Sequence, residues 1–133
     1  MIQTLLGSDA NLASLLLRIA AGIIFLAHGY PKLGSQRKMG ADFMKSTGMP
    51  TWMAAFAAVA EFFGGLALIL GIFTPIIALL FVLWMISTTW FAKTKLHKKL
   101  QGGYEFDLIL MAGSLAIAIL GSGIYSIDHL LGI

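Results

Sequence analysis

The sequence predicts an all-α integral membrane protein, a bundle of four transmembrane helices. Hydrophobic residues make up 59% of the 133 residues and charged residues only 11%, whereas a soluble domain carries about 25% charged residues. So few charges cannot cover the surface of a water-soluble domain. Four apolar segments each approach the ~20 residues that a helix needs to cross hydrocarbon, and they do not alternate as strands would. We expect residues 1–133 to form one membrane domain.

The four spans are expected over residues 12–30, 52–72, 75–91 and 105–124. Pro31 is expected to stop the first span. Thr74-Pro75 is typical of a helix start, because proline is favoured at the first helical position. So few residues separate the second and third spans that we expect these two helices to form a tight antiparallel hairpin. In the longer first loop, Met39 and Phe43 lie one helical turn apart beside basic residues, which predicts a short interfacial helix.

The basic residues are confined to two loops on the same side of the predicted bundle. These loops hold every Lys and Arg except Arg18: Lys32, Arg37, Lys38 and Lys45 in the first loop, and Lys93, Lys95, Lys98 and Lys99 in the third. By the positive-inside rule, both loops should be cytoplasmic and both termini outside. We therefore expect a multi-pass protein of the cell membrane whose basic loops contact lipid rather than nucleic acid.

Two charged residues are expected inside the membrane, Arg18 in the first span and Glu61 in the second. An unpaired Arg at the centre of a bilayer costs at least ~2.5–3.5 kcal/mol on insertion scales. Both residues lie on helix faces rich in Gly and Ala, where backbones can approach closely. We therefore predict an Arg18–Glu61 ion pair that faces the bundle interior. Such a pair can be a functional site, or it can serve only to specify which helices meet.

A second polar cluster is expected at the cytoplasmic ends of the first and fourth spans. It comprises His28 and Lys32 on the first span and Glu105 and Asp107 at the start of the fourth. The two acids suit a helix N-terminus, where the dipole favours negative charge, and this alone can explain them. Alternatively, the four residues could admit protons or bind a quinone carbonyl at the mouth of the bundle.

Several kinds of chemistry find no support in the sequence. The chain has no cysteine, which removes disulfide, thiolate-metal and iron–sulfur chemistry. No two of its three histidines, His28, His97 and His129, are expected to face each other at one depth as ligands of a b-type haem. We find no metal-ligand spacing, and no residue is assigned as catalytic. The chain is expected to carry no intrinsic cofactor.

The order of the polar and glycine positions resembles the DoxX family of small four-helix membrane proteins, from residue 18 to residue 128. The matching pieces are Arg18-x-x-x-Gly22, Gly29-x-x-Lys32, Gly48-x-Pro50, Glu61-x-x-Gly64-Gly65, Gly71-x-x-Thr74, Glu105, Gly121-x-Gly123 and Ser126-x-Asp128. The family pattern puts weight on Arg18, Lys32, Glu61 and Glu105. The resemblance implies a redox-associated membrane component, because some DoxX-like proteins are the membrane subunit of a thiosulfate:quinone oxidoreductase.

Three functions follow from these expectations. The first is a membrane subunit that contacts quinone or a redox partner, with Arg18 and Glu61 as its buried polar site and a partner or the quinone carrying the electrons. The second is a non-catalytic scaffold subunit of a larger membrane complex or homo-oligomer. The third is a small proton-coupled transporter, which a mid-membrane Glu also suits.

Overall fold

The computed structural model describes residues 9–133, and in this part of the chain it is all-helical. Four helices are long and apolar enough to cross a membrane, which confirms the predicted fold class. They are α2 (Ala10–Leu33), α4 (Trp52–Leu70), α5 (Thr74–Thr94), and a fourth in which the irregular segment η1 (Leu100–Tyr104) leads into α6 (Glu105–Leu120). Two short helices, α3 (Arg37–Ser46) and α7 (Ile127–Leu131), complete the structure.

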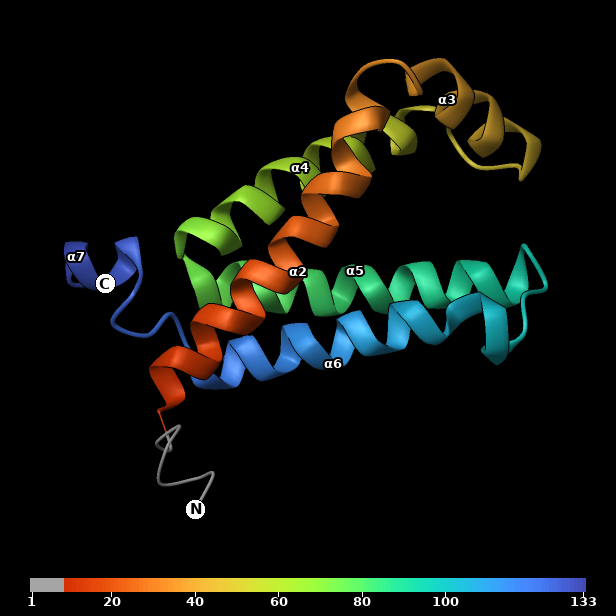
Figure 1. Ribbon diagram of the computed structural model, residues 1–133. Helices are drawn as coiled ribbons and strands as arrows, with labels where there is room; N and C mark the ends of the chain where they lie inside the picture. Colours follow the sequence, from red (N-terminus) through yellow and green to blue (C-terminus); the bar gives the residue numbers. More distant parts are fainter. Residues whose placement is uncertain (1–8) are drawn as a thin grey trace.

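The long helices form two antiparallel pairs, α2 with α4 and α5 with α6 (Figure 1). The pairs lie close together where α4 turns into α5, and they diverge toward α3 and the loop between α5 and α6. We call this second end the basic-loop end, and the opposite end, which carries α7 and the start of α2, the terminal end. All basic residues except Arg18 belong to α3, the last turns of α2 and α5, or the loop after α5. Which end faces the cytoplasm stays a prediction.

Glycine allows α2 and α4 to pack with their backbones in contact. A Cβ atom added at Gly29 would lie 2.5 Å from the backbone nitrogen of Phe62. One added at Gly65 would lie 2.7 Å from the carbonyl oxygen of Gly22. Both distances are shorter than any side-chain carbon tolerates, so this interface requires glycine. The small-residue faces expected from the sequence therefore lie between α2 and α4.

The connection between α4 and α5 is short, but the two helices do not form the tight hairpin that its length predicts. Gly71 and Phe73 turn the chain with left-handed backbone conformations, at φ 70° and 46°. Next to the turn, Gly64 accommodates the ring of Phe81. Farther along, the rings of Phe56 and Trp84 meet edge-on with centroids 6.0 Å apart. From the turn onward α4 and α5 diverge (Figure 1).

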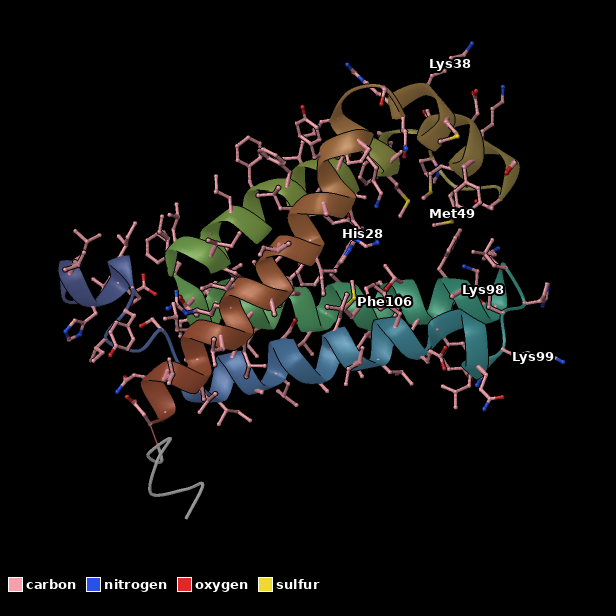
Figure 2. All side chains as sticks on the ribbon, viewed as in Figure 1. His28, Lys38, Met49, Lys98, Lys99 and Phe106 are labelled. Carbon is pink, nitrogen blue, oxygen red and sulfur yellow. The ribbon has the colours of Figure 1, made fainter. Side chains whose placement is uncertain are left out.

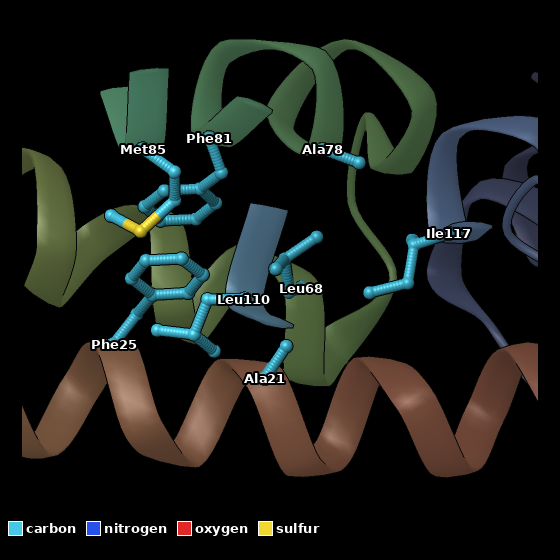
Figure 3. Close-up of a cluster of buried hydrophobic side chains, with 8 residues drawn as sticks. All are labelled: Ala21, Phe25, Leu68, Ala78, Phe81, Met85, Leu110 and Ile117. Atoms are coloured by element: carbon cyan, nitrogen blue, oxygen red, sulfur yellow. The ribbon is translucent and has the colours of Figure 1, made fainter. Parts of the chain in front are cut away.

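An apolar cluster joins the two helix pairs near the middle of the bundle (Figure 3). Its centre is a parallel stack of Phe25 from α2 on Phe81 from α5, with ring centroids 3.6 Å apart. Leu68 of α4 and Ile117 of α6 are completely buried on its terminal side. This cluster places α2, α4 and α5 close enough for their polar side chains to meet on the basic-loop side of it.

Helices α2 and α6 end at other residues than expected, each for a local reason, and α5 runs three residues past its expected end. Helix α2 continues through Pro31 to Leu33, so the prediction that Pro31 stops the span was wrong. Proline in a last turn removes a single donor, and its own carbonyl accepts the Gly34 and Gln36 amides. Helix α6 ends at Leu120 rather than near residue 124, because Gly121 adopts φ 75° and ψ −168°. The short helix expected in the first loop is present as α3.

Candidate functional site

The polar centre of the bundle is the carboxylate of Glu61, which contacts two other helices. Glu61 lies on α4 with 6% of its surface exposed. Its Oε2 accepts a hydrogen bond from Lys32 Nζ of α2 at 2.5 Å, and this is a salt bridge. Its Oε1 accepts a hydrogen bond from Trp84 Nε1 of α5 at 3.3 Å. One carboxylate therefore joins α2, α4 and α5 at the point where α4 and α5 diverge.

Arg18 is buried as expected, but its predicted ion pair with Glu61 is wrong. The Arg18 guanidinium is fully buried and donates to two backbone carbonyls, from Nη2 to Tyr125 at 2.7 Å and from Nη1 to Leu68 at 3.3 Å. Leu68 lies seven residues beyond Glu61 on α4, which corresponds to ~10 Å of helix rise. The two charges thus occupy different levels of the bundle.

Backbone carbonyls can replace the expected carboxylate because of where Arg18 lies. Leu68 belongs to the last turn of α4, where the carbonyls point past the end of the helix and carry partial negative charge. Tyr125 belongs to the non-helical chain after α6, which folds back over this end. Asp128 adds electrostatic attraction to Arg18. Arg18 is therefore compensated at the terminal end, and Glu61 is left to pair with Lys32.

Asp128 itself caps the start of α5. Its carboxylate oxygens accept the amide protons of Phe73 at 2.6 Å and Thr74 at 2.9 Å, and 3% of the residue is exposed. The Asp128 amide in turn donates to the Gly71 carbonyl at 2.9 Å. A residue near the C-terminus thus satisfies the free amides of a helix more than 50 residues earlier. Together with Arg18, it fastens the chain after α6 to the α4–α5 turn.

The four residues expected to cluster at the basic-loop end do not bond to one another in residues 9–133. Lys32 pairs with Glu61. His28 is exposed, and its Nδ1 lies 2.8 Å from the carbonyl of Ile24 on its own helix. The Glu105 carboxylate accepts the amide of Gly102 at 2.9 Å, while Asp107 is half-buried in the first turn of α6. The rings of His28 and Phe106 have centroids 5.8 Å apart, and both side chains are labelled in Figure 2.

An apolar cavity of about 520 Å³ lies between the diverging helices α4 and α5, beside the Glu61 site. Its lining is aromatic and aliphatic, with Ser87 as the one hydroxyl: Phe56, Val59, Ala60, Phe63, Gly64, Ile77, Leu80, Phe81, Leu83, Trp84 and Ser87. Trp84 lines the cavity with its ring and donates its Nε1–H to Glu61. Several lining side chains are themselves exposed, so the cavity opens on the lipid-facing side of the bundle.

Sequence reasoning missed the parts played by Trp84 and Asp128. The other two tryptophans, Trp52 and Trp90, lie near helix ends, as interfacial tryptophans do. Trp84 lies in the middle of α5, and an indole N–H at that depth requires an acceptor. The position of Trp84 in the span could therefore have indicated a buried hydrogen-bond partner. Asp128 is an acidic residue in a largely apolar C-terminal segment, which could have indicated a structural role, but the amides that it caps cannot be identified from sequence.

Comparisons with known proteins agree with this architecture. The family model for DoxX matches residues 13–94. The chain is 34% identical over 118 residues to "Putative oxidoreductase CatD" of Bacillus subtilis (strain 168), covering 89% of this chain and 86% of that one. It is 30% identical over 122 residues to "Inner membrane protein YqjF" of Escherichia coli (strain K12), covering 88% and 90%. No solved structure matches. The chain belongs to the DoxX family and is a multi-pass integral membrane protein.

Proposed function

We propose that this protein is a redox-associated subunit of the cell membrane that binds a quinone between α4 and α5. The observation that carries the proposal is the apolar cavity whose wall includes Trp84, the hydrogen-bond partner of Glu61. A relative named as an oxidoreductase and another named as an inner membrane protein support the redox association and the location.

The residues around the cavity fit a quinone. A volume of about 520 Å³ falls within the ~300–1,000 Å³ typical of small-molecule sites, which combine apolar walls with a few polar groups. Exposed rings such as Phe56 and Phe63 border the opening, where an isoprenoid tail can extend into lipid. A quinone also needs hydrogen-bond donors for its carbonyl oxygens, and the lining residues that carry such groups are Ser87, with its hydroxyl, and Trp84, with its indole N–H.

Each polar residue has a defined role in this proposal. Ser87 Oγ donates a hydrogen bond to the ligand, and the single N–H of Trp84 turns from Glu61 to a quinone carbonyl when the ligand binds. Glu61, which keeps its salt bridge to Lys32, holds or releases a proton at Oε1 or Oε2. The Lys32 side chain is 36% exposed, so it connects the buried carboxylate with the basic-loop end. When bound, a quinone supplies two-electron, two-proton redox chemistry. Because the chain lacks cysteine, we assign the electron source to a partner protein.

Quenching of tryptophan fluorescence tests the proposal. The variant Trp52→Phe/Trp90→Phe leaves Trp84 as the sole tryptophan, and Trp52→Phe/Trp84→Phe leaves Trp90, which is exposed on the same helix. Both purified proteins are titrated in nanodiscs with a short-chain ubiquinone. We expect the Trp84 signal to saturate at about one quinone per chain, while the Trp90 signal falls in proportion to quinone dissolved in lipid. Glu61→Gln should weaken the saturable phase.

A linear response from both variants would contradict quinone binding at this site. Recovery of a stable complex with a larger enzyme, together with that linear response, would favour the scaffold function. Substrate flux in proteoliposomes that depends on Glu61 would favour the transporter.

A further inference from the structure

A second cavity, of about 350 Å³, lies at the basic-loop end between the last turn of α2, helix α3 and the first turns of α4. One part of its lining is polar, with Lys32, Gln36 and Arg37. The other part is apolar, with Met39, Phe43 and Met44. A cavity that combines cations with flexible apolar side chains suits a ligand that has an anionic head and an apolar tail.

Arg37 is the cation free to bind such a head group. Lys32 Nζ is already bonded to Glu61, whereas the Arg37 side chain has no hydrogen bond or salt bridge to any residue from 9 to 133. The guanidinium presents several donors in a planar fork that matches phosphate oxygens. The surrounding field also favours anions, because eight of the nine Lys and Arg residues lie at this end of the molecule.

The position of the cavity points to a lipid rather than a soluble anion. It opens where α2 ends and α4 begins, at the edge of the membrane-spanning region. Met39 and Phe43 of α3 are 61% and 42% exposed beside Lys38 and Lys45. Exposed apolar side chains flanked by basic residues are typical of a helix that lies in the membrane interface. A phospholipid next to such a helix can place its phosphate at Arg37 and its first methylene groups against Met39 and Phe43.

We propose that this cavity is a specific site for an anionic phospholipid. Arg37 and Gln36 bind the head-group phosphate, and Met39, Phe43 and Met44 contact the start of an acyl chain. The residues that line this cavity do not line the α4–α5 cavity, and the lipid site does not depend on the proposed redox function. It predicts that the protein retains an anionic lipid after extraction from the membrane.

Native mass spectrometry of the full-length protein in a neutral detergent tests this site. The protein is delipidated and titrated separately with phosphatidylglycerol, phosphatidylcholine and soluble glycerol phosphate. We expect one phosphatidylglycerol to bind in clear preference to phosphatidylcholine, and no binding of glycerol phosphate at equal concentration. Removing one cation near a lipid head group weakens binding about fivefold, so Arg37→Gln should weaken phosphatidylglycerol binding by about this factor.

Two further variants distinguish lipid binding in this cavity from general attraction of lipid to the basic surface. Lys38→Gln removes the same charge from the neighbouring residue, which does not line the cavity, and it should leave binding nearly unchanged. Gly40→Leu keeps every charge but fills the cavity, since a Cβ there has room and meets only Ala54 Cβ at 3.4 Å. It should reduce binding as strongly as Arg37→Gln. Equal losses in Arg37→Gln and Lys38→Gln, or full binding in Gly40→Leu, would overturn the proposal. Tight binding of glycerol phosphate would identify a soluble anion instead.

Discussion

Replacing Gly29 by alanine tests the packing that positions the Glu61 site. Gly29 lies on α2 three residues before Lys32, where the backbones of α2 and α4 are in contact. An added Cβ would meet three backbone atoms, the Phe62 nitrogen at 2.5 Å and the Ala58 oxygen and Phe62 Cα at 2.9 Å. Backbone atoms cannot rotate away as a side chain can. The helices must therefore separate until the closest contact reaches about 3.4 Å, a movement of roughly 0.9 Å.

The magnitude follows from two opposing effects. Overpacking a close contact costs about 1–3 kcal/mol, while alanine in a helix gains about 0.5–1 kcal/mol over glycine. Separation of the helices also loosens the equally close contact between Gly22 and Gly65, so the cost should lie in the upper half of its range. We expect Gly29→Ala to lower the free energy of unfolding by about 1–2.5 kcal/mol.

Reversible unfolding of the detergent-solubilised protein by sodium dodecyl sulfate, followed by circular dichroism, measures this change. Gly113→Ala on α6 is the matched control, because a Cβ at Gly113 meets no atom within 4 Å. The control should be as stable as the parent or slightly more stable. If Gly29→Ala were as stable as Gly113→Ala, the close backbone contact between α2 and α4 would be wrong.

Three other substitutions have defined outcomes. Asp128→Ala removes the carboxylate that accepts the Phe73 and Thr74 amides and should lower the unfolding free energy by about 1–2 kcal/mol; an unchanged unfolding midpoint would exclude the cap. Arg18→Gln should leave the Tyr125 carbonyl without its donor. Amide hydrogen exchange should then become faster in residues 121–133 and stay the same in α3. Unchanged exchange in residues 121–133 would show that Arg18 does not hold this segment in place. Trp84→Phe keeps an aromatic side chain but removes the N–H to Glu61 and part of the indole ring, a loss of at least about 1 kcal/mol in the same unfolding assay; no loss would mean that this bond does not form.

The fold could be predicted from sequence because membrane insertion depends on properties that a sequence shows directly. Apolar length determines the helices, and the placement of Lys and Arg predicts their orientation. The angle between α4 and α5 could not be predicted, because it depends on how the large side chains of all four helices pack against one another in three dimensions. The cavity exists because of that angle, so it was also beyond sequence reasoning.

The candidate site was predicted in part. The burial of Arg18 and Glu61 was correct, since a charge in an apolar span must face the protein interior. The partner of each was wrong, because the sequence shows side-chain charges but not which backbone carbonyls will lie beside them. Carbonyls at the end of α4 and after α6 compensate Arg18, and Lys32 is long enough to reach Glu61. The roles of His28, Glu105 and Asp107 stay predictions.

We propose Glu61, bonded to Lys32 and Trp84, as the polar centre of a ligand site beside the α4–α5 cavity. Photolabelling of the full-length protein in nanodiscs with an azido-quinone, followed by peptide fragmentation, tests it most directly. We expect the label on residues 56–64 and 77–87, competed by unlabelled quinone and reduced by Glu61→Gln. Label concentrated instead around Arg18 and Tyr125, or label that unlabelled quinone does not compete, would contradict the claim.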